Sequence, residues 1–508
     1  MKALVLALVL ATSAHAETVL NRGNGAEPES LDPAFAGSAA ENNILGDLMV
    51  GLTTYDAAGK PMPGIAERWE VSRNGISWTF HLRKAHWSDG TNVTAQDFLR
   101  AWQRVLAPKT GARNAANLWV MKNARAISAG RLPPSALGVR ARDAQTLEVT
   151  LEQPAPWLPE LLANSSALPQ PRTMGWPKPS AYVSNGPYLL KNWVPGDHIT
   201  LAKNPRFYDV ARIDTVNYYP TPDTQAALRR LRAGELDMQT PVPSAQVAWL
   251  RINMPGALHI MPSLAIAYIP INLHDPALAD IRVRRALNLI YDREAVAQKV
   301  MKLGETPAYS FVPPTVANYR GGPVMDFHAM PYPARLTQAR KLMQEAGYGP
   351  FNRLHLSYAT SGNPDSKRLA AVFQAMARQA WFDVRIEVAD YQLTLRAMRQ
   401  GQFQLGYSTW LADYDDASNF LNLLRSNSAN NYAGYRNPKF DTAMDAAEHQ
   451  PDIGKRALLL KAAEQIALVD MPWLPIRILS QAEAVGSRVG GYIPNPRLVS
   501  RSRWLWVK

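Results

Sequence analysis

The sequence predicts a mixed α/β protein of two or three domains, and three observations lead to this prediction. The chain has 508 residues, which is more than one hydrophobic core usually supports. Its 47% apolar and 9% aromatic residues are typical of a globular chain and exclude a disordered one. Between residues 354 and 407, segments with strand periodicity alternate with segments with helix periodicity, which indicates an α/β lobe covered by helices.

The first half of the chain contains two strands and two helices with recognisable signals. Apolar and polar residues alternate at 78–82, as in a half-buried strand, and residues 147–151 repeat this pattern. Thr94 begins a capping-box sequence, which predicts a helix over 95–106. Asp223 can cap a second helix that runs to Ala233 and ends at a glycine.

The second half shows a longer series of elements. Residues 281–301 carry apolar side chains at helical spacing, and a helix over 337–346 ends at Gly347. A βαβαβ-like series then follows, with strands at 354–358, 384–388 and 403–407 and helices at 366–379 and 393–400.

The N-terminus predicts export from the cytoplasm. Lys2 precedes an apolar run at residues 3–10, and Ala14-His15-Ala16 has the small-x-small pattern of a signal-peptide cleavage site. We therefore expect residues 1–16 to be removed. The chain has no cysteine, which excludes a lipid-modified cysteine anchor, so we predict a free periplasmic protein.

The net charge of +13 suggests a nucleic-acid partner, but the distribution of the charges argues against one. Basic residues are scattered, and no run is longer than Arg229-Arg230 or Arg284-Arg285. An exported basic protein suits an anionic membrane face or an acidic envelope polymer better. We predict no nucleic-acid partner.

The sequence contains no motif that supports catalysis, a cofactor or a metal. The nucleophile elbow, the zinc-protease pair, the phosphate-binding loop and the dinucleotide fingerprint are all absent. His81 and His86 are the only close histidine pair, and they fit ordinary polar positions on a strand and in a turn. The carboxylates of Asp415 and Asp416 are adjacent, and such neighbours on a loop usually point apart. We predict a protein that is not an enzyme.

The segment 407–416 is the most informative part of the chain. A strand leads to Trp410, and Asp413 then follows, with Tyr414 next to it. One interpretation is a surface aspartate in a strand-to-loop turn. The other is a carboxylate in an aromatic-walled cleft that receives a cation, where the contact would be stronger than a surface ion pair.

Seven segments, distributed over nearly the whole chain after residue 16, carry recognisable motifs. The segments are N-G-A-E-P-E-S-L-D-P at 24–33, G-I-A-E-R-W-E-V-S at 64–72, W-T-F-H-L-R-K-A-H-W-S-D-G-T at 78–91, V-T-A-Q-D-F at 93–98, S-N-G-P-Y at 184–188, D-I-R-V-R-R-A-L at 280–287 and W-L-A-D-Y at 410–414. In this order they resemble the dipeptide/oligopeptide solute-binding family of ABC importers.

This resemblance implies a two-lobed periplasmic-binding-protein fold of class II type, with a hinge between the lobes and an inserted domain. The first lobe would comprise residues 17–52, 182–270 and 483–508. The inserted domain would cover 53–181, and the second lobe 271–482. The implied partners are an oligopeptide ligand and an inner-membrane ABC permease, and the protein would be a monomer.

The resemblance also implies where the ligand is held. An extended peptide would pair its backbone with short strands from both lobes, which is β-strand addition enclosed in protein. In the family, the aspartate of the W-x-x-D-Y element binds the peptide α-ammonium, and Asp413 has that position. The backbone contacts would fall on Gly37, Ser38 and Ala39 on one side and on Thr409, Trp410 and Leu411 on the other.

The sequence departs from the family pattern at the carboxylate receptor. Members that bind tripeptides carry an arginine where this chain has Tyr407, and a histidine used with that arginine falls at Ser366. Arg399 and Arg320 match other basic positions that the family uses for carboxylates, and they could equally be solvated surface arginines. Tyr391 completes the predicted ligand-binding residues.

Other functions remain open at this point. Relatives in the family bind nickel chelates, haem or sugars, so a non-peptide solute or a modified peptide such as a cell-wall (murein) peptide is the main alternative. An amine-binding Asp413 favours a peptide. A secreted hydrolase is a second, less favoured alternative.

Overall fold

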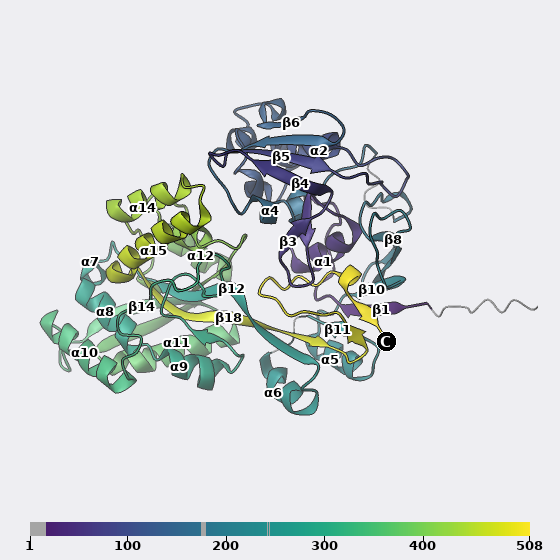
Figure 1. Ribbon diagram of the computed structural model, residues 1–508. Helices are drawn as coiled ribbons and strands as arrows, with labels where there is room; N and C mark the ends of the chain where they lie inside the picture. Colours follow the sequence, from purple (N-terminus) through teal and green to yellow (C-terminus); the bar gives the residue numbers. More distant parts are fainter. Residues whose placement is uncertain (1–16, 174–178, 241, 243) are drawn as a thin grey trace, which may run out of the picture.

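The computed structural model has two lobes and a smaller domain beside the first lobe (Figure 1). It describes residues 17–173, 179–240, 242 and 244–508. The predicted signal peptide at 1–16 lies outside these residues. The C-terminus lies beside β1 (Val19–Gly23), close to the start of the described chain (Figure 1).

A sheet of nine strands extends through both lobes. Its order is β17-β12-β18-β11-β1-β10-β9-β8, with β13 paired to β18. β1 pairs in parallel with β10 and β11, and the other neighbours are antiparallel. The strand bounds are β8 (Tyr188–Val194), β9 (His198–Lys203), β10 (Thr215–Tyr219), β11 (Met238–Gln239), β12 (Leu258–Pro270), β13 (Thr306–Pro307), β17 (Ser408–Leu411) and β18 (Trp473–Val485).

The long strands β12 and β18 join the two lobes (Figure 1). Their register shifts between Pro262 and Ile266, which marks a β-bulge. Ile260 packs with the helices of the first lobe, whereas Ile266 and Ile269 belong to the core of the second lobe. The crossover therefore lies within this strand pair and near the bulge, where a local bend is easiest.

The first lobe carries three helices around its part of the sheet, namely α1 (Ala39–Leu48), α5 (Thr224–Arg232) and α6 (Ser244–Asn253). Asp223 caps α5 as predicted, because its carboxylate accepts from the backbone N–H groups of Gln225 and Ala226. Gly234 follows the helix with a φ of 76°, which glycine adopts at little cost.

The smaller domain has its own four-stranded sheet in the order β4-β5-β7-β6. The predicted strands at 78–82 and 147–151 are confirmed as β5 and β7, and α2 begins after Thr94 as predicted. Asp97 closes the start of that helix by accepting from the Thr94 N–H at 2.8 Å. The elements here are β2 (Thr53–Tyr55), β3 (Pro61–Pro63), β4 (Ala66–Val71), β5 (Ser77–Leu82), α2 (Ala95–Leu106), α3 (Ala124–Ser128), β6 (Val139–Ala141), β7 (Thr146–Thr150) and α4 (Leu158–Leu161).

The second lobe contains a parallel sheet in the order β15-β14-β16, and helices surround it. The predicted βαβαβ series is confirmed. Its elements are α7 (Pro276–Ala279), α8 (Ile281–Ile290), α9 (Arg293–Ala295), α10 (Tyr332–Glu345), β14 (Leu354–Ser361), α11 (Pro364–Arg378), β15 (Phe382–Ala389), α12 (Tyr391–Arg399), β16 (Leu405–Gly406), α13 (Ser418–Leu421), α14 (Pro438–Glu448) and α15 (Ile453–Asp470).

Two predictions in this lobe need correction. The helical pattern at 281–301 is broken after Ile290, because Tyr291 adopts extended backbone and Asp292 caps a new helix. The strand predicted at 403–407 is only two residues long, and the chain then enters β17 in the large sheet. No helix among the described residues has the length and apolar character needed to cross a bilayer.

Candidate functional site

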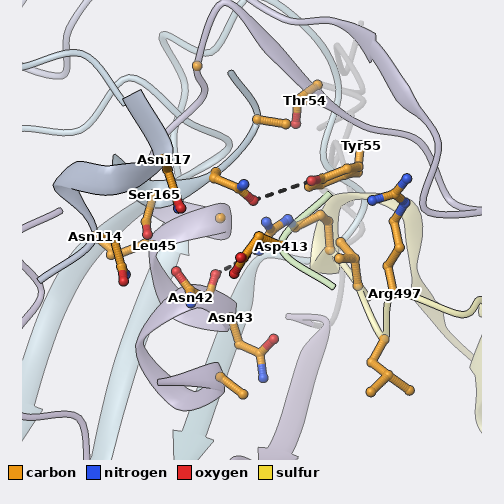
Figure 2. A pocket seen from close by; sticks show the side chains of 18 of the residues that line it. Asn42, Asn43, Leu45, Thr54, Tyr55, Asn114, Asn117, Ser165, Asp413 and Arg497 are labelled. Carbon is orange, nitrogen blue, oxygen red and sulfur yellow. Dashed lines mark hydrogen bonds between the residues drawn. The ribbon is translucent and has the colours of Figure 1, made fainter. Parts of the chain in front are cut away.

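A cavity of about 430 Å³ lies where the two lobes and the smaller domain meet (Figure 2). The first lobe contributes the start of α1 and residues 496–499 and 501. The smaller domain contributes β2 and residues 163–165. The second lobe contributes Leu411, Ala412 and Asp413, which follow or end β17.

Asp413 is the unpaired carboxylate of this cavity. Its side chain is open to solvent, and within the described part of the chain it has neither a hydrogen bond nor an ion pair. The surrounding protein nevertheless removes part of its hydration, and this desolvation raises the pKa of Asp413 above its ordinary value. Such a carboxylate gains most from a cation that brings hydrogen-bond donors to it.

The next two carboxylates in the loop are already engaged. Asp415 accepts from the Ala317 N–H at 2.9 Å and lies 3.1 Å from the Arg497 guanidinium. Arg497 also forms an ion pair with Glu160. Burial raises the pKa of Asp415 to about 6. Asp416 forms a fully buried ion pair with Arg456. The prediction that neighbouring carboxylates point to different surroundings is confirmed.

β17 is an edge strand of the large sheet, because β12 is its only partner strand among the described residues. Its other edge is open to pairing with an added strand. Thr409 and Leu411 are exposed, and Leu411 reaches 59% exposure. Trp410 points to the opposite face, where it packs on the core of the second lobe and donates to Asn419 Oδ1 at 2.7 Å.

The aromatic side chains near Asp413 therefore differ from the predicted arrangement. Neither Trp410 nor Tyr414 lines the cavity. Tyr414 stacks on Trp157 of the smaller domain, with ring centroids 5.0 Å apart and planes at 9°. The aromatic ring that does line the cavity is Tyr55, from β2. Strand alternation explains this difference, because Trp410 lies between two outward-facing residues.

Gly37, Ser38 and Ala39 line the cavity on the first-lobe side, but they form a helix start and no strand. Ser38 is the N-cap of α1, and Glu41 closes a capping box with it. The Glu41 carboxylate accepts from the N–H of Gly37 at 2.6 Å and from the N–H of Ser38 at 2.8 Å. Backbone pairing on this side would therefore not use these two N–H groups.

Tyr407 belongs to a buried polar cluster. Its hydroxyl accepts from Arg477 Nη2 at 3.1 Å, and Arg477 Nε lies 2.6 Å from the Glu305 carboxylate. Arg477 and Glu305 are each almost fully buried. The carboxylate neutralises the guanidinium, so this buried cluster carries no net positive charge, and Tyr407 does not line the cavity. Ser366 is also buried, at the start of α11.

The other predicted residues lie away from the cavity lining. Arg399 is exposed at the end of α12. Arg320 is exposed in a loop, and its carbonyl accepts from Lys461 Nζ at 2.8 Å. Tyr391 begins α12, and its side chain lies outside the described part of the structure. Among the described residues, no group of three or more His, Asp or Glu side chains could hold a metal ion.

Several residues that line the cavity were not predicted. Tyr55, Asn117 and Ser165 come from the smaller domain, and Arg497 comes from near the C-terminus (Figure 2). Ser165 lies 248 positions before Asp413 and 332 before Arg497 in the sequence, so no local pattern links them. The repeated asparagines at 114, 117 and 164 were the available signal, although asparagine is also common in turns.

Comparisons with known proteins give consistent results. Residues 60–432 match the family described as bacterial extracellular solute-binding proteins, family 5 Middle. The chain is 36% identical over 489 residues to the periplasmic oligopeptide-binding protein OppA of Salmonella typhimurium, covering 93% of this chain and 89% of OppA. It is 35% identical over 508 residues to the probable deoxycholate-binding periplasmic protein YgiS of Escherichia coli, covering 97% of this chain and 94% of YgiS.

The structure is also similar to that of a murein tripeptide-binding protein. It matches the periplasmic protein MppA in its unliganded open form with a TM-score of 0.89 and 32% sequence identity. The match covers 97% of this chain and 98% of MppA. The lobes of this protein are therefore arranged as in that open form.

Proposed function

The chain belongs to family 5 of the bacterial extracellular solute-binding proteins, and from this premise we propose that it captures peptides between its lobes for an ABC importer. The relatives OppA and MppA are named as periplasmic binders of oligopeptides and murein peptide. In this proposal the protein acts in the periplasm as a monomer, after cleavage at residue 16, and delivers its ligand to an inner-membrane permease.

The unpaired Asp413 carboxylate carries the proposal. It lies in the cavity between the lobes and immediately follows the exposed edge strand β17. A peptide that adds to this edge would place its α-ammonium beside Asp413. A desolvated ammonium and carboxylate form a charge-assisted hydrogen bond, which is about twice as strong as a neutral one.

The same observation distinguishes between ligand classes. Deoxycholate is an anionic steroid, and YgiS is named as its probable binder. Asp413 would repel such an anion, and much of the cavity lining is polar. A murein peptide remains a second candidate, because Glu305 neutralises Arg477 beside Tyr407, where the tripeptide binders carry an arginine. A neutralised Arg477 suits a ligand whose carboxylate does not bind near Tyr407.

The proposed domain limits place the hinge between the two lobes and leave the inserted domain beside the first one. The separate β4-β5-β7-β6 sheet supports an inserted domain over 53–181. The strand pair β12–β18 supports a hinge between the first lobe and residues 271–482. Closure about this hinge would bring β17 towards the start of α1.

Isothermal calorimetry on Asp413 variants tests the proposal. We expect Asp413→Ala to weaken binding of a free peptide by about 2–5 kcal/mol, or roughly 30- to 4000-fold, because the buried ammonium loses its partner. Asp413→Asn keeps the shape and one acceptor and should cost less. An N-acetylated peptide should bind the wild type poorly and lose much less on the same substitutions.

The double comparison gives the coupling between the carboxylate and the ammonium directly. A coupling near zero in a folded variant would remove Asp413 from the site. Mass spectrometry of the peptide after incubation provides a second check, because a hydrolase would shorten it and a binding protein returns it intact. Mass spectrometry of any ligand that co-purifies would then identify its class.

A further inference from the structure

One wall of the cavity beside Asp413 consists of neutral side chains that can form hydrogen bonds. Asn42 lies on α1, Asn114 and Asn117 lie before α3, and Ser165 follows α4. Figure 2 shows these side chains gathered on one side, with Asp413 beside Asn42. They come from the first lobe and the smaller domain, so they face the end of β17 across the cavity.

This wall keeps unused hydrogen-bonding capacity. An asparagine amide can form up to four hydrogen bonds. Asn114 donates one, to the Ala36 carbonyl at 2.7 Å, and Asn117 makes a long contact of 3.4 Å with Ser166. Within the described part of the chain, the Asn42 side chain has no hydrogen-bond partner. The remaining donors and acceptors are available to a ligand or to water.

The charged residues of the lining are one carboxylate and two arginines. They are Asp413, Arg497 and Arg501. Arg497 is held between Glu160 and Asp415. Arg501 donates to the Asn42 carbonyl at 2.8 Å and lies 6.0 Å from the centre of the Tyr55 ring. Carboxylates therefore hold Arg497 and a backbone carbonyl holds Arg501, whereas Asp413, next to the neutral polar wall, has no partner within the described residues.

We propose that this wall selects a neutral group with several hydrogen-bonding atoms, carried by the ligand next to its ammonium. On a peptide this group is the first side chain, as a carboxamide or hydroxyl, or a sugar attached to it. The inference rests on the proposed peptide-binding function and specifies its ligand. The 430 Å³ of the open cavity exceeds the volume of one side chain and leaves room for a larger polar group.

The alternatives to such a group are each disfavoured at this wall. An apolar first side chain would cover amides without satisfying them, and each unsatisfied polar group costs free energy on burial. An acidic side chain would be repelled by Asp413, and Arg497 is already engaged by Glu160 and Asp415. A neutral polar group avoids both penalties.

Calorimetry on tripeptides that differ only in the first residue tests the inference. We expect the glutamine peptide to bind at least about tenfold tighter than the leucine peptide, and the glutamate peptide to bind weakest. An O-glycosylated serine peptide compared with the serine peptide distinguishes a sugar from a small polar side chain. These measurements need only the wild-type protein.

Variants locate the preference on the wall. Asn117→Leu and Asn42→Leu should each reduce the preference for glutamine over leucine severalfold, chiefly by weakening the glutamine peptide. Asn192→Leu is the matched control, because Asn192 is exposed on β8 and does not line the cavity. It should leave the preference unchanged.

Two outcomes would overturn the inference and can be told apart from failure of the proposed function. If all five peptides bind equally, or if leucine is preferred, with Asp413 still required, the wall has no selective role and peptide capture stands. If no free peptide binds, both proposals fail. An unchanged preference in the folded Asn117 and Asn42 variants would remove the wall from recognition.

Discussion

Asp413 and Asp416 lie three residues apart in one loop, yet their surroundings are opposite. Asp413 faces the cavity without a partner. Asp416 is buried, pairs with Arg456, and accepts from Asn318 Nδ2 at 2.9 Å and from the Ser418 N–H at 2.9 Å. One carboxylate is ready for a cation from outside, whereas the other is satisfied by the protein.

The comparison shows why residue type alone does not identify a site. Both aspartates follow the same strand, and a sequence pattern does not separate them. The difference arises because α15 brings Arg456 to Asp416, while no basic side chain among the described residues pairs with Asp413. The burial of Asp416 is compensated by its partners, whereas the desolvation of Asp413 is not. The stability of the protein should therefore depend on Asp416, and ligand binding on Asp413.

The largest expected effect is on stability, at Asp416. Asp416→Ala leaves the buried Arg456 guanidinium without its carboxylate, which should lower the free energy of unfolding by about 3–5 kcal/mol. Urea unfolding of the variant measures this loss. Asp413→Ala is the matched control and should change stability by less than about 0.5 kcal/mol, because it breaks no contact within the protein.

A double replacement separates the charge from the packing. Asp416→Leu combined with Arg456→Met removes both charges and retains apolar volume, and such exchanges are often neutral or stabilising. We expect it to recover most of the loss caused by Asp416→Ala. If the single Asp416→Ala variant were as stable as the wild type, the buried ion pair would not form in solution.

The next effect concerns pH, and it has opposite signs for stability and for binding. Desolvation raises the pKa of Asp413 in the folded protein above 3.8. In the free protein, the resulting stabilisation is complete below pH 3.8 and is lost as the pH rises through the raised pKa. Binding of an ammonium needs the carboxylate, so affinity should fall as the pH falls through that same pKa.

Calorimetry between about pH 4 and pH 7 measures the binding part of this prediction. The loss of affinity should begin at a higher pH than an ordinary surface aspartate would give. The Asp413→Asn variant should show no such dependence, and an N-acetylated peptide should show little with the wild type. A free peptide whose affinity stays constant over this range would contradict the assigned role of Asp413.

Local features of the fold were predictable from the sequence, whereas contacts between distant segments were not. The helix after Thr94 has its capping box and its apolar periodicity within a few residues, so it was predicted correctly. The orientation of Trp410 depends on the pairing of β17 with β12, which lies far from it in the sequence. The contact of Tyr407 with Arg477 spans 70 residues and two strands, and no local pattern indicates it.

The smallest expected effect concerns the contact that joins the smaller domain to the loop of Asp413. The Trp157 ring stacks on the Tyr414 ring, and the Arg456 guanidinium lies 4.5 Å from the centre of the Trp157 ring. A stacked aromatic pair contributes about 0.5–1.5 kcal/mol beyond its buried area. A cycle of Trp157→Leu, Tyr414→Leu and the double variant should therefore give a coupling of that size in urea unfolding.

A second cycle provides the control for this contact. Trp69 also lies in the smaller domain, where it contacts Phe80 at a centroid distance of 6.0 Å. Trp69→Leu and Tyr414→Leu should be additive within about 0.5 kcal/mol, because their sites share no contact. If the Trp157 cycle were additive too, the smaller domain would not rest on the second lobe through this stack. The loop that carries Asp413 would then be held by its other contacts, among them those of Asp415 and Asp416, and ligand affinity should be insensitive to Trp157→Leu.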